Sequence, residues 1–128
     1  MEKLWNSQSQ APKCSLSINE PKLDEVLLEL GHDDFNIGTA YLRDAVKLFE
    51  PGRYMTKDIY PTVAWMHGTT PARVERNIRH ALDRAWQRAP EITRRRFFGA
   101  SVGPDGRPTV GEYTARLARI CRQAEGQE

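Results

Sequence analysis

The sequence has few cysteines, and they lie far apart. Cys14 and Cys121 stand near opposite ends of the 128 residues, and neither has another Cys or a His at metal-ligand spacing. This separation argues against a zinc site, and we expect neither a metal nor a cofactor. Cys121 falls on the apolar stripe of the last expected helix, where a small core residue is a better explanation than a reactive thiol.

Long apolar runs and catalytic motifs are also missing. No run approaches the roughly 18 residues of a membrane span, and the opening MEKLWNSQSQAPKC lacks the apolar core of a signal peptide. We therefore expect a cytoplasmic protein without a membrane partner. The sequence shows no glycine-rich phosphate loop, no Ser/His/Asp set and no Asp/Glu/His metal cluster. An enzyme, including one acting on nucleic acid, is the weakest interpretation.

No segment with the two-residue period of a strand is long enough to predict a strand, so the sequence predicts an all-α fold. A chain of this length fits one domain. We expect a flexible N-terminal tail over residues 1–20, a helical domain over 21–124 and a disordered C-terminus over 125–128. Apolar periodicity and turn residues predict about six helices, the first stopped by Gly31 and the last opened by a capping box at Thr109 and Glu112.

The net charge of +2 hides an asymmetry along the chain. Residues 20–50 hold eight acids and three bases, a balance of −5, whereas residues 70–96 hold eight arginines and three acids, a balance of +5. A basic second half is typical of nucleic-acid-binding proteins. A charged face that merely keeps the protein solvated would give the same balance.

The stretch TTPARVERNIRHALDRAW is the strongest helix signal. Thr70 is a good N-cap, Pro71 falls at the first helical position, and an apolar stripe follows at helical period. A third helix beginning at Thr56 ends near Gly68, which supplies the turn between the two. Helix, short turn and helix form the helix-turn-helix arrangement. Pro61 lies just past the first turn of that third helix, so we expect a bent or delayed start there.

The side of this helix away from the stripe carries long polar side chains. Arginine can hold guanine O6 and N7 together, and glutamate can accept from cytosine N4, so such a helix suits the major groove. It also suits a solvated surface helix. Glu75 and Arg79 stand four residues apart, and the pair favours either a surface ion pair or two base contacts.

Several blocks in and around this stretch resemble a known family. They are Arg73-Val74-Glu75-Arg76, Ile78-Arg79-His80-Ala81 and Ala85-Trp86, with Tyr41-Leu42-Arg43, Thr56-Lys57, Tyr60-Pro61, Phe98-Gly99 and Pro108-Thr109 in support. The chain resembles, over roughly residues 23–122, the C-terminal DNA-binding effector domain of the master response regulator that starts sporulation in spore-forming bacteria.

The resemblance implies six helices with a central helix-turn-helix, and a transcription regulator whose helix 70–88 enters the major groove. It implies base contacts by Arg73, Glu75 and Arg79 on a short TGNCGAA-like box in double-stranded DNA. It also implies a homodimer formed on tandem boxes, and a contact with the RNA polymerase sigma subunit. The family carries a phosphoacceptor receiver domain before this region, and we expect this chain to act without one.

A second set of side chains suits phosphate oxygens, which position a helix without reading sequence. These are Arg76, His80, Asn77, Thr70, Lys57, Arg94 and Arg95. On the helix expected over residues 90–98 we place Arg94, Arg95 and Arg96 outward and Ile92, Phe97 and Phe98 inward. Trp65, Met66 and Trp86 are expected in the core, and His32 and His67 at the surface.

A rival hypothesis is an interaction module that kept the fold without binding DNA, serving as an adaptor or anti-regulator. A chain without a receiver domain gives this rival some weight. The joint presence of Arg73, Glu75 and Arg79 argues against it, because an adaptor would have no need of these three residues together.

Overall fold

The computed structural model describes residues 17–99 and 106–126, and over these residues it contains six α-helices, one π-helical segment and no strand. Their bounds, in chain order, are α2 Glu20–Glu29, α3 Ile37–Leu48, η1 Met55–Ile59, α4 Tyr60–His67, α5 Pro71–Arg88, α6 Glu91–Phe98 and α7 Val110–Gly126. The prediction of an all-α fold with about six helices is confirmed. Most of the tail expected over residues 1–20, and the last two residues, lie outside the described ranges.

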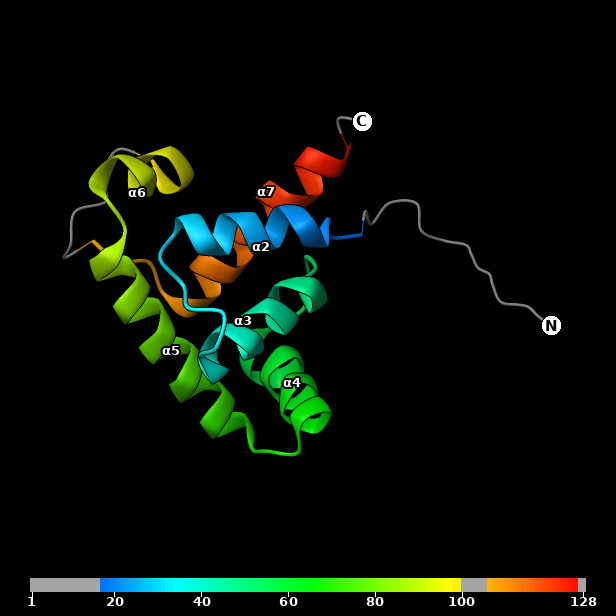
Figure 1. Ribbon diagram of the computed structural model, residues 1–128. Helices are drawn as coiled ribbons and strands as arrows, with labels where there is room; N and C mark the ends of the chain where they lie inside the picture. Colours follow the sequence, from blue (N-terminus) through cyan, green and yellow to red (C-terminus); the bar gives the residue numbers. More distant parts are fainter. Residues whose placement is uncertain (1–16, 100–105, 127–128) are drawn as a thin grey trace.

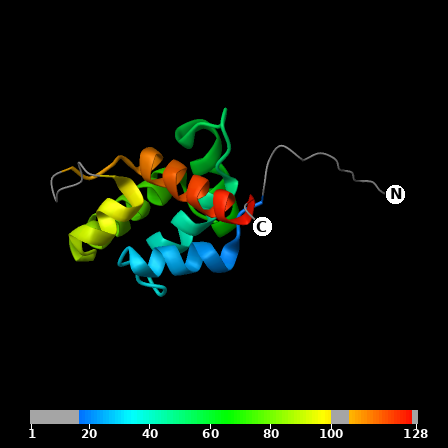
Figure 2. The same ribbon diagram turned by 90° about the horizontal axis from the view of Figure 1, so that it is seen from above.

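Helix α3 forms the centre of the arrangement. It packs against α4, α5 and α7, and α2 packs along α7 on the side away from α4 (Figures 1 and 2). Helix α6 projects beyond the C-terminal end of α5 (Figure 1). The long helix α5 therefore lies at the border of the bundle, with one side against α3 and α4.

Short polar side chains fix the ends of the helices, as the sequence suggests. Asn19 caps α2 through Lys22 N at 3.0 Å, and Asn36 caps α3 through Gly38 N at 2.7 Å. The capping box is confirmed, since Thr109 N donates to Glu112 Oε1 at 3.0 Å and Glu112 N donates to Thr109 Oγ1 at 3.1 Å.

The delayed helix start at Pro61 is also confirmed. The carbonyl of Tyr54 accepts from both Asp58 N at 2.9 Å and Ile59 N at 3.1 Å, which widens the turn into the π-helical segment η1. Regular α-helix begins only at Tyr60, so Pro61 occupies the first turn, where its missing N–H leaves no bond unmade.

One continuous core joins every helix except α6, whose Phe97 and Phe98 pack against its edge. Trp86 and Cys121 are fully buried in it, as predicted. Burial also raises the pKa of the Cys121 thiol to about 11, which keeps it protonated and unreactive at neutral pH.

Three assignments to the core are wrong. Trp65 is 82% exposed, Met66 is exposed, and Ile92 on α6 is 77% exposed. Helix α4 has only eight residues, and it buries the side that carries Tyr60, Val63 and Ala64. Trp65 and Met66 follow directly after that side and therefore turn outward. Helix α6 contacts the bundle at few points, so its apolar residues were a poor guide to its inner side.

The surface assignment of His32 is also wrong, because its side chain is only 4% exposed. Gly31 at φ +91° ends α2, and His32 N bonds back to Leu27 O at 3.0 Å, which turns the ring inward. There His32 Nε2 lies 2.8 Å from the Tyr113 hydroxyl. Burial, reinforced by the Arg88 charge, lowers the pKa of His32 to about 4, so the ring is neutral at pH 7.

Candidate nucleic-acid interface

Helix α5 is held at its N-terminus by the residues that the sequence indicated. Thr70 Oγ1 accepts from Arg73 N at 3.2 Å, and Pro71 is the first helical residue. Gly68 adopts the left-handed conformation at φ +66°, and Thr69 N donates to Ala64 O at 2.9 Å. Three residues thus reverse the chain between α4 and α5, and the start of α5 is fixed relative to α4.

The inner side of α5 is fully apolar. Its buried residues are Val74, Ile78, Ala81, Leu82, Ala85 and Trp86. On the outer side Arg73, Arg76, Arg79 and His80 are exposed, whereas Glu75 and Asn77 are partly covered. The outer side of the first three turns is therefore a row of hydrogen-bonding groups, and the exposed apolar residues there are Pro71 and Ala72.

Glu75 and Arg79 form an ion pair, with 2.9 Å between Glu75 Oε2 and Arg79 Nη1. Both side chains are about 44% exposed, so the pair stabilises the helix by only about 0.3–0.5 kcal/mol. So small a contribution allows a nucleic-acid base to replace either partner at little cost. Tyr60 lies behind the pair. Burial, with a smaller effect of the Glu75 charge, raises the pKa of the Tyr60 hydroxyl to about 12.

Arg73 does not share a flank with this pair. At about 100° per residue, Arg79 lies about 40° from Glu75 around the helix axis, whereas Arg73 lies about 160° away on the opposite flank. Arg76 falls between the two flanks. The residues predicted to contact bases therefore line both edges of the outer face. Only a partner broad enough to cover that face can contact all of them at once.

Asn77 is the predicted phosphate contact whose position fits least well on α5. Its Nδ2 donates to Arg73 O at 2.8 Å within the helix, and its side chain is half-buried. Its backbone faces Gly38, where a Cβ would stand only 2.2 Å from Asn77 O. Asn77 is thus turned toward α3, and its amide is already bonded.

The prediction that Arg94 faces outward to meet a phosphate is wrong. The side chain is 7% exposed, and its Nη1 donates to Trp86 O at 3.0 Å and to Ala89 O at 2.7 Å. The guanidinium also lies 5.6 Å from the centre of the Trp86 ring. Arg94 satisfies carbonyls at the C-terminal end of α5, where a positive charge is favourable. It holds α6 against α5.

The other predicted phosphate contacts remain at the surface. Arg95 is exposed and pairs with Glu91 at 2.9 Å, and Lys57 is exposed on η1, 5.8 Å from the Tyr54 ring centre. Arg96 pairs with Glu29 across to α2. Lys57 lies on η1, which precedes α4, and Arg95 lies on α6, which follows α5.

The described residues offer little for other chemistry. Among them no three His, Cys, Asp or Glu side chains gather closely enough to hold a metal ion. Within the same ranges, no helix is both long enough and apolar enough to cross a membrane. A hollow of about 720 Å³ lies beside η1 and α4 and is lined by Leu48, Arg53 and Trp65 among others. It lacks a buried titratable group that would suit catalysis.

An all-α bundle that presents a capped, arginine-rich helix at its border is an arrangement found in the class of small helical DNA-binding domains. Comparison with family models assigns the chain within that class. Residues 23–120 match the family described as "Sporulation initiation factor Spo0A C terminal", and the chain belongs to this family. It is therefore a DNA-binding effector domain of the sporulation-regulator type, and the family is a regulatory one rather than a class of enzymes.

Proposed function

We propose that this protein is a sequence-specific transcription regulator that binds double-stranded DNA through α4, the Gly68–Thr70 turn and α5 acting as a helix-turn-helix. The observation that carries the proposal is the outer face of α5, where exposed arginines surround a weak ion pair on a helix whose position α3 and α4 fix. An α-helix fits the major groove, and arginine and glutamate can read its base edges.

In this proposal Arg79 and Glu75 read bases on one flank of α5, and Arg73 reads a base on the other. The major groove is about 12 Å wide, enough to enclose both flanks of one helix. Arg76, between the flanks, and His80, on the flank of Arg73, hold phosphates, together with Lys57 on η1 and Arg95 on α6. Thr70 contributes through the start of the helix, since its hydroxyl already caps α5. Asn77 can hold a phosphate only if the hydrogen bond from its Nδ2 to Arg73 O breaks.

The DNA element we propose is a short TGNCGAA-like box, because its guanines and CG step offer acceptors to arginine and a cytosine amine to Glu75. Two copies of the protein would occupy tandem boxes, and the sigma subunit of RNA polymerase is the proposed protein partner at promoters. These details derive from the family resemblance, supported by the side chains that α5 exposes.

A gel-shift titration with a duplex that contains the box and one that carries the same bases scrambled tests the proposal. We expect the box duplex to bind more than about tenfold tighter, because each wrong base pair typically costs 1–3 kcal/mol. Arg119→Ala is a control for arginine substitutions on α5, since Arg119 is an exposed arginine on a different helix, α7. Equal binding of the two duplexes contradicts sequence-specific recognition, and no binding of either supports the adaptor hypothesis.

A further inference from the structure

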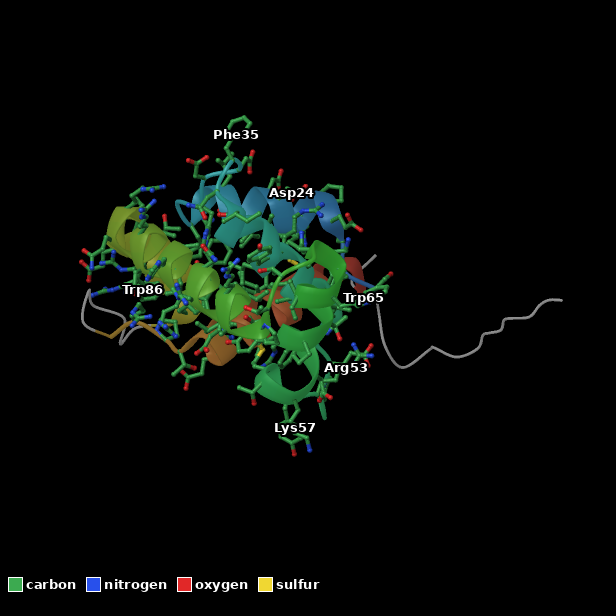
Figure 3. The ribbon with its side chains drawn as sticks, turned by 90° about the horizontal axis from the view of Figure 1, so that it is seen from below. Asp24, Phe35, Arg53, Lys57, Trp65 and Trp86 are labelled. Atoms are coloured by element: carbon green, nitrogen blue, oxygen red, sulfur yellow. The ribbon has the colours of Figure 1, made fainter. Side chains whose placement is uncertain are left out.

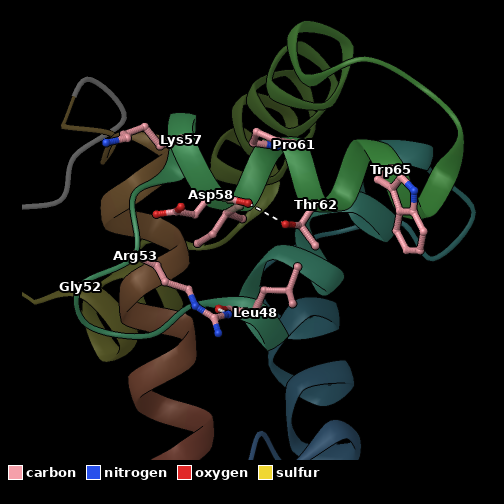
Figure 4. A pocket seen from close by; sticks show the side chains of 9 residues that line it. Leu48, Gly52, Arg53, Lys57, Asp58, Pro61, Thr62 and Trp65 are labelled. Atoms are coloured by element: carbon pink, nitrogen blue, oxygen red, sulfur yellow. Dashed lines mark hydrogen bonds between the residues drawn. The ribbon is translucent and has the colours of Figure 1, made fainter.

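The C-terminal end of α4 leads into the turn of the proposed helix-turn-helix, and several side chains there face solvent. Trp65 is 82% exposed and lies at the edge of the molecule (Figure 3), and Met66 is exposed as well. Thr62 Oγ1 donates back to Asp58 O at 2.8 Å, within the same length of chain (Figure 4). A polar contact between this end of α4 and another helix comes instead from the last helical residue, His67.

His67 bonds to an acid of the central helix α3. Its Nε2 lies 2.6 Å from Asp44 Oδ2, and because a carboxylate only accepts hydrogen bonds, the ring donates. The two side chains are 29% and 16% exposed, so water shields them less than it shields the Glu75–Arg79 pair. Hydrogen bonds to a charged group are stronger than neutral ones, and partial burial preserves that strength.

The His67 ring is also held by packing. Tyr41, which is buried on α3 three residues before Asp44, meets the ring edge-on, with 4.9 Å between the ring centres and 66° between the ring planes. Aromatic rings favour this arrangement. Tyr41 and Asp44 lie on the same side of α3, one turn apart. We call Tyr41, Asp44 and His67 together the His67 latch.

The latch is connected to the start of α5 through the turn. Thr69 N donates to Ala64 O at 2.9 Å, and Thr70 caps α5 by accepting from Arg73 N at 3.2 Å. The close contact between α3 and α5 comes one turn later, at Asn77. The first turn of α5, which carries Arg73, is therefore held from its N-terminal side by the end of α4.

We propose that the His67 latch positions the turn between α4 and α5, and with it Arg73, for DNA binding. His67 and Asp44 are positioning residues that act without touching DNA. They keep the turn of the free protein in the conformation that binds, so less conformational freedom is lost on binding. The consequence for DNA rests on the proposed function, whereas the hold on the turn does not.

Amide hydrogen exchange of the full chain without DNA, followed by NMR, tests the hold on the turn. We expect the Thr69 amide to exchange about threefold to tenfold faster in His67→Leu, the factor that a partly exposed hydrogen bond to a charge provides. His67→Gln should exchange like the parent, because its amide nitrogen can donate to Asp44 in place of Nε2. Met66→Leu is a matched control, since it places the same side chain one residue earlier.

Titration of the same variants with the box and scrambled duplexes tests the consequence for recognition. His67→Leu should bind the box duplex about threefold to tenfold more weakly, whereas His67→Gln and Met66→Leu should bind like the parent. A purely structural residue would leave this affinity unchanged well below the melting temperature, where nearly all molecules are folded. Adding Asp44→Leu to His67→Leu should cost no further affinity, because the two residues share one bond.

Four results would overturn the proposal: unchanged Thr69 exchange in His67→Leu, His67→Gln exchanging as fast as His67→Leu, full affinity of His67→Leu for the box duplex, or additive losses in the double variant. If His67→Leu does not stay folded, Asp44→Asn replaces it and should show the same changes at a smaller size, because it keeps the acceptor oxygen but removes the charge. If the parent binds both duplexes equally, the sequence-specific function fails, and Thr69 exchange still decides whether the latch holds the turn.

Discussion

Single side chains on α5 divide between reading bases and holding the backbone. Arg79 and Arg76 are both exposed arginines one turn apart, so substituting each gives a closely matched pair. They differ in orientation, since Arg79 lies beside Glu75 and Arg76 lies about 100° around the axis from Glu75.

We predict that Arg79→Ala weakens binding to the box duplex by about 1–3 kcal/mol and relaxes discrimination at one base pair. Arg76→Ala should weaken binding to box and scrambled duplexes alike, and lower the salt dependence by about one unit. Titrations of both variants on both duplexes at two salt concentrations make the comparison. If Arg79→Ala loses the same affinity on the two duplexes, direct base reading by Arg79 is excluded.

His32 gives a prediction about pH. Its pKa is about 4 in the folded protein, against an ordinary value near 6.5, so the unfolded chain binds more protons between these values. The free energy of unfolding should therefore fall as the pH drops from 6.5 toward 4, with His32 contributing about 3 kcal/mol over that window.

Urea unfolding of the parent and of His32→Gln at pH 7, 5.5 and 4 measures this contribution. Glutamine keeps a polar group near the Tyr113 hydroxyl but does not titrate. The parent should lose more stability than the variant over the window, and equal losses would show that His32 is not the group responsible. Carboxylates such as Glu20, whose pKa the hydrogen bond from Arg43 lowers, contribute equally to both proteins.

At the scale of helices, the crossing of α3 and α5 sets where α5 sits. Gly38 lies in this crossing, and a Cβ there would stand 2.2 Å from Asn77 O and 2.9 Å from Ala81 Cβ. The atom met first belongs to the backbone of α5, so a side chain at Gly38 cannot be accommodated by a rotamer change. Close approach of the two helices requires glycine at this position.

We predict that Gly38→Ala lowers the free energy of unfolding by about 1–3 kcal/mol, the usual cost of overpacking. Gly111→Ala is a matched control, because Gly111 is likewise the second residue of its helix, and a Cβ there meets only Met55 Cγ at an ordinary 3.5 Å. Thermal melting followed by circular dichroism should show a lower midpoint for Gly38→Ala alone. Similar midpoints for the two variants would mean that α3 and α5 separate easily.

At the scale of the whole molecule, the charge of the two halves should decide which face meets DNA. The arginine-rich second half includes α5 and α6, whereas the acids of the first half lie on α2, α3 and their connection. Several of those acids are engaged by basic residues, as Asp24 and Glu20 are by Arg43 at 2.7 and 3.0 Å. The outer side of α5 is left as the basic surface.

We predict a steep salt dependence of DNA binding. Each neutralised phosphate adds about −0.9 to the slope of log K against log salt, so roughly four to six contacts per subunit give a slope of about −4 to −5. Fluorescence anisotropy with a labelled one-box duplex, at several salt concentrations, measures it. A slope shallower than about −1 would show that the basic half faces away from DNA.

Local rules were enough for the helices and for the face of α5. Thr70, Pro71 and an apolar stripe at helical period predict α5 at its observed start, because capping and amphipathicity act within a few residues. The same holds for the box at Thr109 and Glu112 and for the late start at Pro61. The exposed row Arg73, Arg76, Arg79 and His80 follows from that stripe without knowledge of the fold.

Packing between helices, some adjacent and some distant in the chain, decided the rest. Arg94 turns inward because it can bond to the carbonyls of Trp86 and Ala89. His32 turns inward because its ring bonds to Tyr113, which is 81 residues away in the sequence. Trp65 points outward because α4 buries only one narrow side. These outcomes depend on which helices meet and at what height, and no spacing along the chain encodes that. The sequence determined the helices and the charge of α5, whereas tertiary contacts determined which arginine is structural and which aromatic rings reach the surface.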